Sequence, residues 1–168
     1  MATPLEIERK YLIEYPNLEW LTSHPDVAVS EITQTYLSSP CGEERRVRMR
    51  REGETVHYYY TVKRRVTAVT REEEEAAITE VQYNAYLTEA DPNCHPLQKT
   101  RYCIPHEGMV LEIDVYPFWD QQAVLEVELL REDTPVTLPP EIRVIREVTG
   151  EKVFKNSELA KGHPSCNP

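Results

Sequence analysis

The 168-residue chain has little glycine, with five residues in total and no glycine-rich segment. Phosphate-binding loops of the Walker or Rossmann type need several closely spaced glycines, so these nucleotide-binding folds are excluded. No run approaches the roughly 18 apolar residues of a membrane-spanning helix. Residues 1–10 carry Glu6 and Glu8 where a signal peptide needs an apolar core. We therefore expect a cytoplasmic protein that does not associate with membranes.

Cysteine is also sparse, and basic residues are outnumbered by acidic ones. The four cysteines form no CxxC pair, and Cys94, His95, Cys103 and His106 match no structural zinc module, so free thiols in a reducing compartment are expected. Nineteen Lys and Arg against 29 Asp and Glu give a net charge of −10. This charge argues against a surface for duplex nucleic acid or for an anionic membrane.

The length is that of a single domain, and the charged residues within it follow a regular pattern. We expect one domain over residues 1–163 and a loose C-terminal tail over residues 164–168. Segments in which charged residues alternate with mostly apolar ones indicate six or more β-strands with two different faces. The charged positions are Glu6, Glu8, Lys10, Arg46, Arg48, Arg50, Lys63, Glu73, Glu75, Lys99, Arg101, Glu112, Asp114, Glu126 and Glu128.

Helix signals are few. Thr79 and Gln82 have the spacing of a capping box, which predicts a helix of about ten residues ending before Asp91. Residues 17–21 and 157–160 are predicted to form short helical turns. The predicted fold class is therefore mainly antiparallel β (α+β) with a few helices.

The charges are sorted by sign from strand to strand. The simplest explanation is that each charged face is the solvated side of a half-exposed sheet. A solvated face tends to mix signs, however, because like charges on one face repel each other. If the strands close into a barrel with the charged faces inward, acidic walls face basic walls and the lumen has a net charge near −1. Two divalent cations would bring it to about +3, which suits a polyanion.

The chemistry of these side chains supports a site for metal and phosphate. Carboxylates clustered without histidine or thiolate select Mg²⁺ or Mn²⁺, and Mg²⁺ is usually held by a few carboxylates together with substrate phosphates. Lysine and arginine bind phosphate oxygens. Phosphoryl transfer depends mainly on positioning and on neutralising charge, so such a lumen needs no covalent nucleophile.

The segment Glu6-Ile7-Glu8-Arg9-Lys10 resembles the ExExK motif of the CYTH, or triphosphate tunnel metalloenzyme, superfamily. The later segments appear in the family's order: Arg46 to Arg50, Thr61 to Lys63, Glu73 with Glu75, Lys99 to Tyr102, Glu112 to Asp114, Glu126 to Glu128, Val148 to Gly150 and Asn156 to Ala160. The resemblance covers nearly the whole chain. It implies an eight-stranded closed antiparallel barrel that forms a tunnel for a triphosphate and divalent metal ions.

The resemblance also implies roles for individual residues. Metal ligands are expected at Glu6, Glu8, Glu75, Asp114, Glu126 and Glu128, holding one or two Mg²⁺ or Mn²⁺ ions. Phosphate ligands are expected at Lys10, Arg46, Arg48, Arg50, Lys63, Lys99 and Arg101. Lys10, Tyr36, Glu8 and Asp114 are the catalytic candidates, although Tyr36 could equally be a packed wall residue. Ala77 stands where relatives often carry a third glutamate, which weakens the expectation of a second metal.

The family contains enzymes with different substrates. The EIERK start most resembles bacterial tripolyphosphatases, so we expect hydrolysis of inorganic tripolyphosphate to pyrophosphate and phosphate by in-line attack of water. One alternative is a class IV-type adenylate cyclase or a thiamine or nucleoside triphosphatase. A further alternative is a non-catalytic binder of polyphosphate or of triphosphate-ended RNA. A triphosphate is the expected small-molecule partner, and a homodimer is an open possibility.

Overall fold

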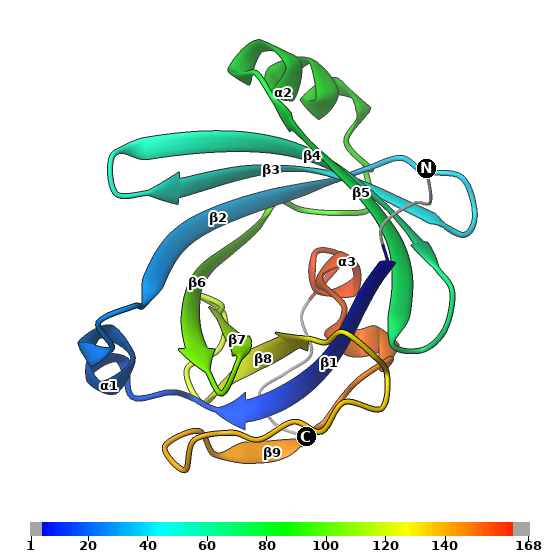
Figure 1. The fold of residues 1–168 in the computed structure, drawn as a ribbon. Coiled ribbons are helices and arrows are strands. Elements are labelled where there is room, and N and C mark those ends of the chain that lie inside the picture. Colours follow the sequence, from blue (N-terminus) through cyan, green and yellow to red (C-terminus); the bar gives the residue numbers. More distant parts are fainter. Residues whose placement is uncertain (1–4, 163–168) are drawn as a thin grey trace.

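The computed structural model describes residues 5–162 and has a mainly antiparallel β fold with three short α-helices in that range (Figure 1). The helices are α1 (Leu18–Ser23), α2 (Glu80–Tyr86) and α3 (Asn156–Leu159), with 3₁₀ turns η1 (Leu87–Glu89) and η2 (Lys152–Phe154). The strands are β1 (Leu5–Glu14), β2 (Ala28–Leu37), β3 (Glu43–Glu52), β4 (Thr55–Arg65), β5 (Thr70–Ile78), β6 (Leu97–His106), β7 (Met109–Val115), β8 (Gln122–Glu128) and β9 (Val144–Glu147).

Eight strands close into an antiparallel barrel in the order β5-β4-β3-β2-β6-β7-β8-β1. The closing contact between β1 and β5 is short, because only Leu5, Glu6 and Ile7 of β1 pair with β5. Beyond this seam, residues 11–13 of β1 pair instead with β9. The eight-stranded closed barrel expected from the sequence is therefore confirmed, and β9 is an added strand that the sequence did not predict.

The charged faces point into the barrel and the apolar faces point outward. A buried cluster that includes Ile13, Ile104, Leu111 and Leu125 lies on the outer side of β1, β6, β7 and β8, and Leu21 of α1 packs into it. Successive side chains of a strand point to opposite faces, so an apolar outer face requires the alternate charged residues to face the lumen. The interpretation of the charged faces as solvated is wrong for this reason.

Helix α2 lies outside the barrel, where Figure 1 shows it as a green coil above β4. Thr79 caps it with the predicted capping box, in which the Gln82 side chain bonds back to the Thr79 backbone. Tyr83 of α2 packs against Tyr58, and Tyr86 stacks on Tyr60, with ring centroids 4.9 and 4.7 Å apart. The tyrosine-rich strand thus serves in part to attach this helix.

An apolar layer fills one end of the lumen. Leu12 and Val124 face inward at that end, where they pack with Trp119, with Phe154 of η2 and with Leu159 of α3. Figure 1 shows α3 within the ring of strands. The C-terminal segment therefore plugs the barrel, and the charged cavity occupies the remainder of the lumen.

Other expectations concern the surface and the ends of the chain. Cys41, Cys94 and Cys103 are free thiols, as expected, while Cys166 and the predicted tail lie outside the described residues. In residues 5–162 we find no helix with the length and apolar character needed to cross a membrane.

Candidate active site

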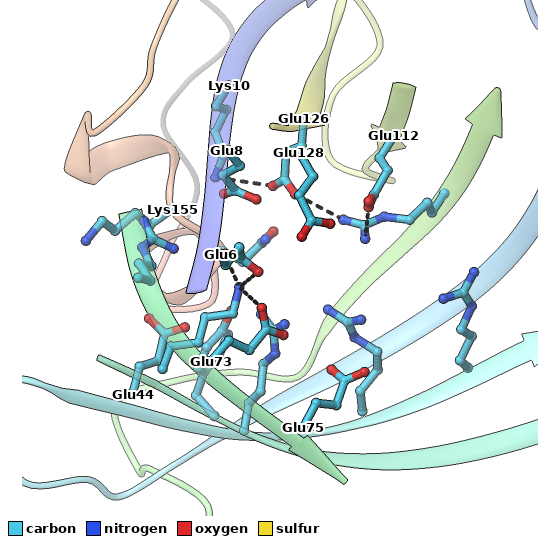
Figure 2. A pocket seen from close by; sticks show the side chains of 18 of the residues that line it. Glu6, Glu8, Lys10, Glu44, Glu73, Glu75, Glu112, Glu126, Glu128 and Lys155 are labelled. Carbon is cyan, nitrogen blue, oxygen red and sulfur yellow. Dashed lines mark hydrogen bonds and ion pairs between the residues drawn. The ribbon is translucent and has the colours of Figure 1, made fainter. Parts of the chain in front are cut away.

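The barrel encloses a cavity lined almost entirely by charged side chains (Figure 2). Eight acidic and eight basic residues line it, so their formal charges cancel. The full lining is Glu6, Glu8, Lys10, Tyr36, Glu44, Arg46, Arg48, Arg50, Lys63, Arg71, Glu73, Glu75, Arg101, Cys103, Glu112, Glu126, Glu128, Lys155 and Asn156. Of the predicted site residues, all except Lys99 and Asp114 are brought together here.

Strands β1 and β8 form an acidic wall. Their register places Glu8 directly opposite Glu128, and Lys10 opposite Glu126. Lys10 Nζ lies 3.3 Å from the Glu126 carboxylate, whereas the carboxylates of Glu8 and Glu128 form no hydrogen bond or ion pair with any described residue. Burial and the charge of Glu126 raise the pKa of Glu8 to about 7, and burial together with Glu6 raises the pKa of Glu128. Like charges directly opposite each other on adjacent strands are destabilising, and here Lys10 and Lys63 act on the two carboxylates only from beyond ion-pair distance.

A second carboxylate pair lies at the seam between β1 and β5. Lys63 Nζ lies 2.8 Å from Glu6 Oε1 and 3.9 Å from Glu73. Burial alone would raise the pKa of Glu6, but its hydrogen bond with Glu73 and the charge of Lys63 lower it to about 2. Burial and the neighbouring Glu6 raise the pKa of Glu73 to about 8. Glu6 and Glu73 therefore share one proton at neutral pH.

Strand β3 supplies the basic wall, and its arginines differ in their partners. Arg46 is 5% exposed, and its Nε is buried without a hydrogen-bond partner among the described residues. Arg48 donates from Nε and Nη2 to the side-chain oxygen of Gln34. Arg50 lies nearer the open end, where it donates to Ser30 and pairs with Glu52. Arg46 and Arg48 thus have no carboxylate within ion-pair distance in the described chain.

Arg101 on β6 is, in contrast, surrounded by carboxylates. It makes two hydrogen bonds of 2.7 and 2.8 Å to Asp114, another of 3.3 Å to Glu126, and an ion pair with Glu112. Lys99 lies 2.7 Å from Asp114, and the side chains of both are fully buried. Burial and the nearby Arg101 lower the pKa of Lys99 to about 7.

Lys99 and Asp114 are not among the residues that line the cavity, so their expected roles as a phosphate ligand and a metal ligand stay predictions. The physical reason for their absence from the lining is depth in the barrel. Val124, the register partner of Asp114 on β8, belongs to the apolar layer that fills this end of the lumen. At this depth Asp114 forms ion pairs with Lys99 and Arg101 beside the apolar layer.

Tyr36 on β2 lies at the boundary between the cavity and the apolar layer. Burial, more than any charge, raises its pKa well above the ordinary tyrosine value. Its hydroxyl therefore stays protonated across the physiological range and can donate a hydrogen bond.

Several cavity residues were missed at the sequence level. Glu44 continues the alternation of β3 by one step, and Arg71 does the same for β5, so extending the period-2 pattern would have found both. Lys155 and Asn156 come from the plug, and only the folded chain brings them to the cavity. The side chains of Arg71 and Lys155 form no hydrogen bond or ion pair with another described residue, and burial together with the charge of Arg71 lowers the pKa of Lys155.

The carboxylates fit a hard divalent cation in chemistry. Glu8 and Glu128 are unpartnered oxygen donors on adjacent strands, and a cation between them would replace repulsion with attraction. No three Asp, Glu, His or Cys side chains in residues 5–162 already converge as a formed metal cluster. Glu6 and Glu126 flank the pair but are engaged by Lys63 and Lys10, so they would have to exchange these partners to complete a metal shell.

Comparison with known proteins agrees with this geometry. Residues 4–161 match the CYTH domain. An inorganic triphosphatase of Nitrosomonas europaea is 29% identical over 164 residues, which are 95% of this chain and 99% of that protein. A crystal structure of an inorganic triphosphatase, also 29% identical, superposes with a TM-score of 0.57 and covers 98% of this chain and 99% of its own. A protein from Pyrococcus horikoshii with 21% identity shares the fold, with a TM-score of 0.55 over 76% of this chain and 80% of its own. The chain belongs to the CYTH domain family.

Proposed function

We propose that this chain hydrolyses inorganic tripolyphosphate to pyrophosphate and phosphate with the help of a divalent cation. The observation that supports this most directly is the pairing, in one cavity, of cations without carboxylate partners and carboxylates without cation partners. A polyanion and a metal ion together would satisfy both sets. The similarity to inorganic triphosphatases at 29% identity points to the same substrate.

The basic wall would bind the phosphate chain. The free Nε of Arg46 is a buried donor that is costly to leave unsatisfied, and a phosphate oxygen is the acceptor that suits it. Arg71 and Lys155 add two positive charges without local partners. Lys10 and Lys63, which now pair with carboxylates, can bind phosphate once a metal ion takes those carboxylates.

The acidic wall would hold the metal ion. Glu8 and Glu128 are the primary candidates, with Glu6 and Glu126 completing the set and Glu75 across the cavity as a helper for the attacking water. A bound Mg²⁺ or Mn²⁺ would neutralise charge on the phosphates and help to orient water. Asp114 would act by holding Arg101 and Lys99 in place, since it does not reach the cavity.

We propose inorganic tripolyphosphate as the substrate, in preference to a triphosphate with an organic substituent, because of the side chains that line the cavity. Tyr36 is the only aromatic side chain among the described residues that line the cavity, and it lies at the plugged end. A nucleotide or thiamine derivative would therefore gain little stacking there. An organic substituent would have to remain at the open end.

The test is release of phosphate from tripolyphosphate, ATP, thiamine triphosphate and pyrophosphate, each with Mg²⁺ and with Mn²⁺, together with an assay for cyclic AMP. We expect tripolyphosphate to be cleaved fastest, because three phosphates reach more of the cations than two do. Equal turnover of pyrophosphate would contradict the proposal. Conversion of ATP mainly to cyclic AMP would assign the chain to the cyclases.

A further inference from the structure

The cations of the cavity fall into two groups, those that carboxylates neutralise and those that keep their full charge. Arg101 contacts three carboxylates, Lys63 contacts Glu6, and Lys10 contacts Glu126. Arg48 belongs to the second group although it is only 7% exposed. Its one side-chain partner among the described residues is the neutral amide of Gln34.

Gln34 is completely buried on the lumen face of β2, directly opposite Arg48 in the β2–β3 register. Its oxygen accepts from Arg48 Nε at 3.1 Å and from Nη2 at 2.7 Å. A guanidinium can only donate, so the amide oxygen must face Arg48 and the amide nitrogen must point away from it. That nitrogen donates to the Tyr36 hydroxyl at 3.3 Å.

This arrangement also directs the Tyr36 proton. The Tyr36 oxygen accepts from Gln34, and the positive charge of Arg46, its register partner on β3, acts on the same oxygen. A hydroxyl orients its proton away from donors and cations. The proton is thus left to point toward the cavity, which Tyr36 lines.

We propose that Gln34 is a positioning residue of the phosphate site, one that orients Arg48 without neutralising it and turns the Tyr36 hydroxyl toward the substrate. The inference rests on the proposed function, because it takes a triphosphate as the ligand of Arg48. A glutamate at this position has nearly the same shape as glutamine and could accept the same hydrogen bonds from Arg48. It would cancel the charge that phosphate needs, so the choice of an amide over a carboxylate has a functional reason.

The experiment is a binding titration of tripolyphosphate by calorimetry without divalent cation, together with steady-state kinetics in Mg²⁺. Gln34→Glu should weaken binding at least about tenfold, since a charge-assisted phosphate contact is lost. Gln98→Glu, the same change on an exposed residue of neighbouring β6, should leave the affinity unchanged. Thermal unfolding shows whether each variant is folded.

A double-mutant cycle separates positioning from a merely structural role. Gln34→Met adds no charge and removes all three side-chain hydrogen bonds, the two from Arg48 and the one to Tyr36. It should weaken binding about fivefold in the wild-type chain and by less than about twofold when Arg48 is already methionine, because coupled residues are not additive. Equal effects of Gln34→Met in both backgrounds, or unchanged binding by Gln34→Glu, would overturn the proposal.

The two proposals fail in different ways. A wild-type chain that binds tripolyphosphate without hydrolysing it contradicts the proposed function, while the binding cycle still tests Gln34. A chain that hydrolyses tripolyphosphate with unchanged KM and kcat in Gln34→Glu contradicts only the role of Gln34. A chain that does not bind tripolyphosphate at all contradicts both.

Discussion

Single carboxylates of the cavity differ in whether they hold the fold together or oppose it. Asp114 accepts from Lys99 and Arg101 and is fully buried, whereas Glu8 and Glu128 lie directly opposite each other and neither carboxylate forms an ion pair with a described residue. Removal of one partner from a buried ion pair leaves the other charge unsatisfied and is strongly destabilising. Removal of one of two repelling carboxylates is not destabilising, because it relieves the repulsion. Two predictions follow from this contrast, one for each kind of carboxylate.

The first concerns the unpartnered pair. Glu8→Gln and Glu128→Gln should each lower the metal-dependent turnover of tripolyphosphate by about a hundredfold or more, because charge needed to hold the cation is lost. Thermal unfolding of the metal-free variants should occur at the wild-type temperature or slightly above it. Glu14→Gln, an exposed residue at the end of the same strand, is the matched control. Full activity of Glu8→Gln would show that this carboxylate is not a metal ligand.

The second prediction concerns the buried carboxylate. Asp114→Ala should lower the free energy of unfolding by about 3 kcal/mol, since Lys99 and Arg101 lose their shared partner. Urea denaturation measures this loss directly. A metal ligand would behave differently, because its removal would abolish turnover and leave stability intact. That outcome would restore Asp114 to the metal site, as the sequence suggested.

Among the secondary-structure elements, the C-terminal plug has the greatest influence on the site. Phe154 of η2 is 7% exposed in the apolar layer, and its backbone oxygen accepts from Lys10 Nζ at 3.3 Å. The plug therefore closes the lumen and at the same time holds a catalytic candidate on β1. Stability and positioning are coupled through one short segment.

Substitution in the plug tests this coupling. Phe154→Ala should destabilise the barrel by about 3–5 kcal/mol, the range for deleting a buried aromatic ring. It should also reduce kcat, because the backbone oxygen that accepts from Lys10 is held less firmly once the ring is removed. Val153→Ala, at the adjacent residue with 54% exposure, should change the stability by less than about 0.5 kcal/mol. The urea midpoints and kcat values of the two variants are the measurement. Equal effects of the two substitutions would show that the Phe154 ring neither stabilises the barrel nor positions Lys10.

Most elements were predictable from local pattern. The strands have a two-residue alternation, and α2 has its capping box, so both are encoded within a few neighbouring residues. Strand β9 was missed because all four of its residues are exposed and carry no alternation. It exists only because residues 11–13 of β1 have a free edge beyond the short β5 pairing.

For the whole molecule, the cavity is balanced in formal charge while the chain carries −10, so the excess negative charge lies outside the cavity. The individual glutamates of the cavity differ, however, in how their surroundings shift their pKa values. Glu8 and Glu73 have their pKa values raised to about 7 and about 8, and Glu6 has its pKa lowered to about 2. These shifts make the stability of the metal-free barrel depend on pH.

The direction follows from proton linkage. In the unfolded chain Glu8 and Glu73 lose their protons near pH 4.5, while in the fold they keep them until about pH 7 and 8. The folded state binds more protons in this window, so stability should fall as pH rises from about 5 to 7; above pH 7 the lowered pKa of Lys99 acts in the opposite direction. The stabilisation from Glu6 is complete above pH 4.5 and does not change in this range. Thermal unfolding of metal-free protein across these pH values is the measurement.

Addition of Mg²⁺ should reverse this trend. Since a metal ion binds the carboxylate form, its affinity should rise with pH up to about 8, and binding at pH 6 should release protons. Calorimetry in buffers of different ionisation enthalpy detects that release. A melting temperature that is independent of Mg²⁺ at pH 8 would contradict the proposed metal site.

The sequence by itself determined which side chains share a face and what sign each strand presents, because both follow from a two-residue period within one strand. It also carried the family motifs. Only the tertiary structure decided which charges are neutralised. Lys63 meets Glu6 across 57 residues, Arg101 meets Glu126 on a different strand, and Lys99 and Asp114 lie too deep to reach the cavity. Such pairing depends on the register between distant strands and on depth in the barrel, and no local pattern encodes either.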